Sequence, residues 1–124
     1  MAERICGVAA ASLPWLVAEQ SGQVVGYAYA TKWKARSAYR FSVESSVYLA
    51  QSVIGQGLGS KLYEALFALL KERGVHVVIG VITLPNPASI AFHEKLGLKK
   101  VAHFEEVGFK FNKWLDVGCW QIAL

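Results

Sequence analysis

The chain has 124 residues, a length that fits one domain with a single hydrophobic core. Hydrophobic residues make up 54% of it, yet no apolar run reaches the roughly 18 residues of a membrane-spanning helix, which argues against a transmembrane protein. The net charge of +4 favours an anionic partner such as a phosphate-bearing cofactor, and the scattered basic residues argue against nucleic-acid binding.

Short β-branched and aromatic runs predict that a sheet begins early in the chain. Residues 16–19 and 24–30 flank a Ser21-Gly22 turn, which is typical of a hairpin. Residues 38–50 alternate in their second half, so we predict a long strand there. One face of this strand carries Val43, Ser45, Val47 and Leu49, and the other carries Glu44, Ser46 and Tyr48.

A glycine-rich stretch, residues 55–59, separates this strand from a predicted helix over residues 60–73. Gly74 suits the end of the helix, because a left-handed C-terminal conformation costs glycine nothing. Residues 75–82 are almost wholly apolar, as expected of a central strand covered on both faces.

The last third of the chain predicts one helix and two strands. Asn86-Pro87 supply an N-cap and a first-turn proline for a short helix that Gly97 closes. Residues 99–107 and 117–124 are predicted strands, separated by an aromatic and basic loop at residues 108–114. This order of elements predicts a mixed sheet with helices, an α/β (α+β) domain.

The glycine-rich loop is the first candidate for chemistry. A glycine loop that leads into a helix exposes unpaired N–H groups at the positive end of the helix dipole, where phosphate oxygens are stabilised. Residues 57–60 have this form, but they match neither the P-loop nor the dinucleotide fingerprint. Both a phosphate cradle and a tight turn without a ligand remain open at this point.

Three separated motifs, in the correct order, resemble the GNAT superfamily of acetyltransferases. They are VESSVYL at residues 43–49, the glycine loop, and LPNPASIAFHEKLGL at residues 84–98. The resemblance extends from about Trp15 to Leu124. Within the superfamily, the chain resembles phosphinothricin and methionine sulfoximine N-acetyltransferases in the segments PWLVAE (14–19), VGYAYA (25–30), WKAR (33–36) and WLDVGCWQ (114–121).

This resemblance implies a mixed, mostly antiparallel sheet in which the strands at 43–49 and 75–82 splay apart. The pantetheine arm of acetyl-coenzyme A (acetyl-CoA), the co-substrate, would pair with backbone groups exposed by the splay, and no metal is implied. The resemblance implies eleven cofactor-binding residues: Val47, Tyr48, Leu49, Gly55, Gln56, Gly57, Leu58, Gly59, Ser60, Asn86 and Ser89. For Asn86 and Ser89, simple N-capping of the helix is the alternative role.

The resemblance also implies the catalytic residues. Acetyl transfer to an amine needs a base, because the ammonium form has no lone pair, and Glu44 stands at the family's position for it. His93 stands where many members carry a tyrosine acid, so it would protonate the leaving thiolate or assist the base. The alternatives are a solvent-facing Glu44 and a structural His93. Trp33, Arg36 and Tyr39 would bind the acceptor, with Arg36 pairing with its acidic group.

The chain departs from the family pattern in two places. Ile54 replaces the usual glutamine or arginine that opens the pyrophosphate motif. Only about fifteen residues precede the strand at Leu16, so we interpret residues 1–14 as a remnant of the N-terminal helical region, with the family's first strand and helix missing. The apolar surface left uncovered predicts a homodimer, with or without exchanged elements.

Together these observations favour a single acetyltransferase domain over residues 1–124. It would acetylate the primary amine of a small amino acid such as phosphinothricin or methionine sulfoximine. Cys6 and Cys119 lack metal-ligand spacing and fit reduced thiols of a cytoplasmic protein. The alternative is a truncated, non-catalytic module that binds coenzyme A or dimerises. Acetylation of protein N-termini or lysines is less favoured, since the sequence has no distinctive acidic docking surface.

Overall fold

A computed structural model describes residues 3–7 and 13–124 of the chain. The strands are β1 (Glu3–Gly7), β2 (Trp15–Gln20), β3 (Gln23–Lys32), β4 (Ser42–Leu49), β5 (Val77–Leu84), β6 (Lys99–Lys110) and β7 (Lys113–Ala123). The α-helices are α1 (Leu58–Glu72) and α2 (Pro87–Lys95), and short 3-10 helices occur at η1 (Ser37–Tyr39) and η2 (Gln51–Val53).

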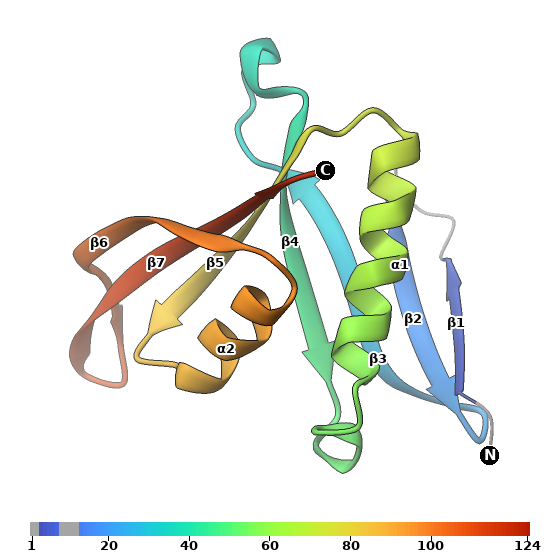
Figure 1. Cartoon of the computed structure of the whole chain (residues 1–124). Helices are drawn as coiled ribbons and strands as arrows, with labels where there is room; N and C mark the ends of the chain where they lie inside the picture. Colours follow the sequence, from blue (N-terminus) through green and yellow to red (C-terminus); the bar gives the residue numbers. More distant parts are fainter. Residues whose placement is uncertain (1–2, 8–12) are drawn as a thin grey trace.

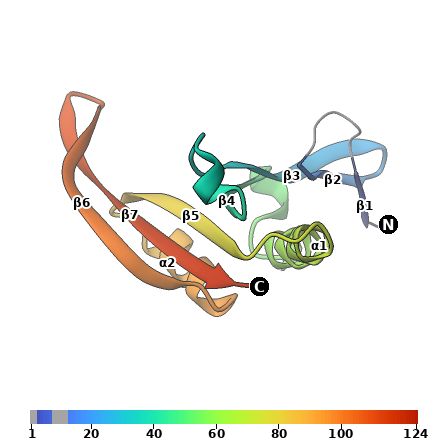
Figure 2. The ribbon, with the colours of Figure 1, turned by 90° about the horizontal axis from the view of Figure 1, so that it is seen from above.

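The strands form one sheet in the order β1-β2-β3-β4-β5-β7-β6. All neighbouring strands are antiparallel except β4 and β5, which run parallel (Figure 1). Seen from above, the sheet twists strongly between β1 and the β6–β7 hairpin (Figure 2). The predicted mixed, mostly antiparallel sheet with flanking helices is therefore confirmed.

The N-terminal strand corrects one prediction. Residues 3–7 are not the tail of a helix: they form β1, which pairs antiparallel with β2 from Glu3↔Gln20 to Gly7↔Leu16. Pairing satisfies the backbone groups along an edge of β2 that would otherwise stay open, and Ile5 packs against the core. The rest of the predicted helical remnant, apart from Leu13 and Pro14, lies outside the described residues.

Helix α1 covers the sheet with an apolar stripe. Leu58, Leu62, Leu66 and Leu70 recur every four residues and are fully buried, together with Tyr63. Burying one leucine side chain contributes about 1.5–3 kcal/mol, so this stripe anchors the helix. The helix begins two residues earlier than predicted, and Gly74 follows its C-cap with a left-handed φ of 82°, as expected. Within the described residues, none of the helices has the length and apolar character needed to cross a membrane.

The predicted loop at residues 108–114 is wrong, because the strands continue through it. β6 reaches Lys110 and β7 begins at Lys113, so only Phe111 and Asn112 form the turn. Both turn residues are left-handed, with φ of 53° and 59°, as a two-residue turn between twisted strands requires. Phe111 is unusual in such a turn, which is why the sequence did not predict it.

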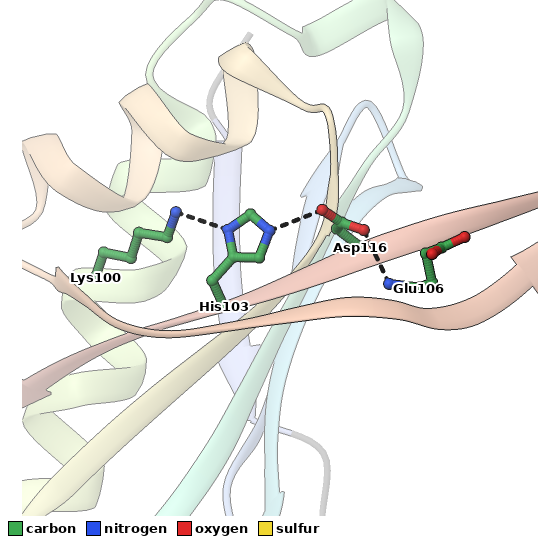
Figure 3. A network of polar contacts seen from close by, with 4 residues as sticks. All are labelled: Lys100, His103, Glu106 and Asp116. Atoms are coloured by element: carbon green, nitrogen blue, oxygen red, sulfur yellow. Dashed lines mark hydrogen bonds and ion pairs between the residues drawn. The ribbon is translucent and has the colours of Figure 1, made fainter.

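A polar network stabilises an irregularity in this hairpin (Figure 3). The register of β6 and β7 shifts between Phe104 and Gly108, where Glu106 adopts a left-handed φ of 52°. Asp116 accepts the Glu106 backbone N–H at 2.9 Å and pairs with His103 Nε2 at 2.8 Å. The hydrogen bond from His103, with that from Glu106, lowers the pKa of Asp116. Since a carboxylate only accepts, Nε2 donates, and Nδ1 is left to accept from Lys100 Nζ at 3.0 Å.

Candidate active site

The central feature of the site is a fork between the two parallel strands. β4 and β5 pair only from Ser42↔Val77 to Ser45↔Gly80 and then diverge (Figure 1). The second half of each strand therefore lacks its neighbour on that side. The predicted splay of these two strands is confirmed.

The backbone of β4 presents polar groups to this fork. The Ala50 N–H donates to the β3 side at 2.8 Å, and the Ser42 carbonyl accepts from that side at 3.4 Å. The direction of the backbone groups alternates along an antiparallel pair, so even-numbered positions of β4 bond β3. The backbone N–H and C=O groups of the odd-numbered positions Val47 and Leu49 therefore face β5. Tyr48, an even position, has its backbone groups in the β3 ladder.

The backbone of β5 faces the fork from the opposite side. The Leu124 N–H donates to the His76 carbonyl at 2.8 Å, so even-numbered positions of β5 bond β7. By the same alternation, the backbone groups of Val81 and Thr83 point toward β4, where the two strands no longer pair. The fork thus has two facing strand edges, which suit an extended ligand that carries amide groups.

A cavity of about 600 Å³ extends from the fork to the start of α1 and to α2. It brings together nine of the eleven predicted cofactor-binding residues. Tyr48 and Gln56 are the two that do not line it: the Tyr48 ring stacks on Tyr27, and the Gln56 side chain donates to the Ser52 carbonyl. The lining residues are Val47, Leu49, Ile54, Gly55, Gly57, Leu58, Gly59, Ser60, Asn86, Ala88, Ser89, Ala91, Phe92 and Lys95.

The glycine loop presents the N-terminus of α1 to this cavity. Gly57 is the N-cap with a left-handed φ of 77°, and no side chain caps the helix there. The first backbone N–H groups of a 15-residue helix therefore remain available to an anion. Ile54 lines the same cavity with 60% of its surface exposed, so an apolar side chain stands beside these donors.

Helix α2 forms the opposite wall, and its cap is the one predicted. The Asn86 side-chain oxygen accepts the Ser89 N–H at 3.2 Å, and Pro87 follows in the first turn. Both Asn86 and Ser89 also line the cavity. Capping and contact with a ligand therefore do not exclude each other at this helix start.

Removing this cap tests how far the cavity wall depends on it. Asn86→Ala is expected to lower the free energy of unfolding by about 1 kcal/mol, the usual cost of a lost N-cap. It is also expected to weaken binding of acetyl-CoA, the co-substrate that the sequence predicts. Thermal unfolding and titration calorimetry measure the two effects. Asn86→Asp keeps a capping oxygen and is the matched control for stability. Full stability in Asn86→Ala would show that the cap is dispensable.

His93 is held in α2 as a neutral ring. Its Nδ1 lies 2.8 Å from the Ser89 carbonyl oxygen, and only 6% of the residue is exposed. A carbonyl only accepts, so Nδ1 carries the proton and Nε2 has the lone pair. Burial lowers the pKa of His93, which keeps the ring uncharged near neutral pH. In this state Nε2 can accept a proton but has none to give to a leaving group.

Glu44 lies at the closed end of the fork, on the sheet face opposite α1. It is half-buried, between Thr31 on β3 and Ile79 on β5. Burial raises the pKa of the Cys119 thiol, and the charge of Glu44 adds to this, so the two side chains are close. The Glu44 side chain is therefore only partly exposed to solvent.

The three predicted acceptor residues come together after β3. Trp33, Arg36 and Tyr39 line a cavity of about 450 Å³ with Lys34 and Ala35. The sequence analysis did not select Lys34. Its charge lowers the pKa of Cys119, opposing the effect of Glu44. The described part of the chain contains no cluster of side chains suited to a metal ion.

Comparison with known proteins identifies this arrangement. The Acetyltransferase (GNAT) family matches residues 3–98. The chain belongs to the GNAT family. It is 46% identical to a phosphinothricin N-acetyltransferase of Streptomyces viridochromogenes, over 87% of the chain and 59% of that protein. It is 40% identical to an L-methionine sulfoximine/L-methionine sulfone acetyltransferase of Salmonella typhimurium, over 90% of the chain and 65% of that protein.

A solved GNAT structure supports the same fold. The chain superimposes with a TM-score of 0.86 on a phosphinothricin acetyltransferase from Sinorhizobium meliloti in complex with acetyl-CoA. The two are 39% identical, and the match covers 90% of this chain and 61% of that one. The chain thus spans about three fifths of the length of these GNAT relatives.

Two buried residues that carry a hydroxyl group have no obvious sequence signal. Ser45 and Tyr63 are both buried and lie on the α1 side of the sheet. The only hint in the sequence was a hydroxyl at an inward-facing position of β4 and another in the apolar stripe of α1. In such patterns a tyrosine looks like an ordinary core residue.

Proposed function

We propose that this chain is the catalytic core of an N-acetyltransferase that uses acetyl-CoA and acetylates the primary amine of a small amino acid. The observation that carries the proposal is the fork, which offers open backbone edges beside an uncapped helix start. The amides of a pantetheine arm can pair with the open backbone groups of Val47, Leu49, Val81 and Thr83. The phosphates of the cofactor can bind at the N-terminus of α1. Glu44 stands where the acetyl end of such an arm would lie.

The chemistry assigned to this site is direct attack by the amine. Glu44 accepts the proton of the amine as its nitrogen bonds to the acetyl carbon. Backbone N–H groups of Val47 and Leu49 stabilise the negative charge that forms on the carbonyl oxygen. The neutral His93 ring suits one of two roles: it accepts the proton together with Glu44, or it supports the wall that α2 forms.

The basic surroundings support an acceptor with an acidic group. Lys34 and Arg36 lie in the cavity with Trp33 and Tyr39. An adjoining cavity of about 410 Å³ is lined by Lys32, Lys34, Arg36, Arg40 and Arg73, with no acidic lining residue. Bidentate pairing of Arg36 with a carboxylate or phosphinate would orient the amine toward Glu44.

Thiol release from acetyl-CoA over a panel of amines tests the proposal. Phosphinothricin, methionine sulfoximine, methionine sulfone and unmodified L-amino acids make a graded series. Turnover of at least one compound is expected. Binding of acetyl-CoA without turnover would favour the alternative, a non-catalytic coenzyme A-binding module, which Ile54 at the helix start also favours.

We also propose a homodimer and a cytoplasmic location. Both cysteines are free thiols, as a reducing compartment requires. The β6–β7 hairpin exposes large apolar side chains, which a second copy would cover with or without exchanged elements. They are Val101, Phe104, Val107, Phe109, Phe111 and Trp114, each at least 47% exposed.

A charge in this surface is expected to weaken the dimer. Trp114→Asp should raise the dissociation constant of the dimer at least tenfold, which corresponds to about 1.4 kcal/mol. The average mass measured by light scattering should then move toward that of the monomer. Val24→Asp changes a similarly exposed residue outside the hairpin and should leave the mass unchanged. A wild-type chain that is monomeric at every concentration would rule out the dimer.

A further inference from the structure

A basic cavity lies at the end of α1 that is farthest from the glycine loop. Its volume is about 410 Å³, within the usual range of small-molecule sites. Arg73, the C-cap of α1, lines it, whereas the glycine loop precedes the N-terminus of the same helix. A helix of 15 residues is about 22 Å long, and the two cavities share no lining residue. The basic cavity is therefore separate from the candidate cofactor cavity.

The basic cavity also lies on the opposite side of the sheet from Glu44. Its lining includes Val43, which is 2% exposed and belongs to the core beneath α1. Successive side chains of a strand point to opposite faces, so Glu44 points away from the cavity. β4 is paired with both β3 and β5 at these two positions, which closes the sheet there. An amine bound in this cavity cannot reach the carboxylate, so the cavity is not the place of acetyl transfer.

Basic and apolar side chains line the cavity together. None of the described lining residues is acidic, and five are basic: Lys32, Lys34, Arg36, Arg40 and Arg73. Like charges that share a cavity repel one another, and an anion among them removes that repulsion. Leu13, Val43 and Val75 form an apolar base, because each belongs to the core or packs against it. The lining thus suits a molecule with an anionic group and an apolar part.

Arg40 is held in an orientation that suits an anion. Its Nη1 donates to the Ser37 carbonyl at 2.9 Å, and its Cζ lies 4.4 Å from the centre of the Phe41 ring. The Phe41 carbonyl accepts the His76 and Val77 N–H groups at 2.8 Å and 3.2 Å, which ties the β3–β4 connection to the start of β5. The guanidinium keeps further N–H groups for a planar, bidentate contact with an oxyanion.

We propose that this cavity binds a small organic phosphate monoester and that the bound molecule weakens acceptor binding. The phosphate group suits the lysines and arginines, and the organic part suits the apolar base. Lys34 and Arg36 also line the acceptor cavity of about 450 Å³. A dianion that holds both side chains on the α1 side of the sheet withdraws them from the acidic group of the acceptor. The competition rests on the proposed function, and the binding site does not.

Titration calorimetry of the whole chain with phenyl phosphate, at constant ionic strength, tests the site. Arg40→Gln is expected to raise the dissociation constant at least tenfold and Lys32→Gln at least threefold, because both residues line this cavity and neither lines the acceptor cavity. Arg40→Lys keeps the charge but loses the bidentate contact, so a smaller rise is expected. Lys99→Gln removes an exposed charge from β6, outside the cavity, and is the matched control for Lys32→Gln.

Several results would overturn the site. They are a wild-type chain that binds no phenyl phosphate, and an affinity that neither Arg40→Gln nor Lys32→Gln reduces. Displacement of phenyl phosphate by coenzyme A would place it at the start of α1 instead. Methyl phosphate, which lacks the apolar part, is expected to bind more weakly, and equal affinity would overturn the role of the apolar base. Lys32 is exposed at the end of β3, so Lys32→Gln keeps the test valid if Arg40→Gln unfolds.

Steady-state kinetics test the competition. Phenyl phosphate at ten times its dissociation constant is expected to raise the acceptor KM at least threefold and to leave the KM for acetyl-CoA unchanged. An unchanged acceptor KM would overturn the competition. If phenyl phosphate binds as expected and no amine is acetylated, the proposed function fails and the site stands. If an amine is acetylated and phenyl phosphate does not bind, the site fails and the function stands.

Discussion

Glu44→Gln is expected to lower kcat by about two to four orders of magnitude, the range of a lost general base. The amide keeps the size of the side chain but cannot accept the proton of the amine. Acetyl-CoA binding should not change, because the residues that line the 600 Å³ cavity do not include Glu44. Steady-state thiol release gives kcat, and titration calorimetry gives the dissociation constant.

The matched control is Glu72→Gln, at the exposed end of α1. It removes the same charge without touching the fork and should leave kcat within twofold. A kcat of Glu44→Gln equal to the wild type would exclude Glu44 as the base.

The sequence predicted best those parts of the fold that have a strong local pattern. Two local patterns predict the helices: leucines recur every four residues in α1, and Asn86-Pro87 begins α2. Both helices are present as expected. β1 was missed because five residues hold too little alternation to reveal a strand, and its pairing with β2 is what defines it. The β6–β7 turn was missed because Phe111 lacks the usual turn chemistry.

The candidate site was predictable only where side chains form motifs. The glycine loop was found from its own pattern, and resemblance added the cofactor roles of Asn86 and Ser89. The structure gathers all of them around one cavity. Which backbone groups are open depends on strand register, so the absence of Tyr48 from the cavity could not be anticipated.

Gly80→Ala is expected to damage both stability and cofactor binding. A Cβ atom at Gly80 would lie 2.8 Å from His93 Cδ2 and 2.9 Å from Nε2, closer than van der Waals contact allows. β5 is held between β4 and β7 at this position, so the relief must come from α2. Overpacking of this kind costs about 1–3 kcal/mol. Thermal unfolding measures that cost.

The displacement of α2 should reach the cavity, because the same helix carries Asn86 and Ser89 in its wall. The dissociation constant for acetyl-CoA is therefore expected to rise about tenfold, or 1.4 kcal/mol. Gly108→Ala is the matched control, since its Cβ would meet its neighbours only at 3.6 Å and 3.7 Å, an ordinary contact.

A double-mutant cycle identifies the contact responsible. If the His93 ring causes the clash, Gly80→Ala should cost much less in a His93→Ala background, with a coupling energy of about 0.5–3 kcal/mol. Additive effects would mean that the Gly80 methyl acts on β5 itself and that α2 does not move. In that case the wall of the cavity would be independent of the closed end of the fork, and acetyl-CoA affinity would survive the substitution.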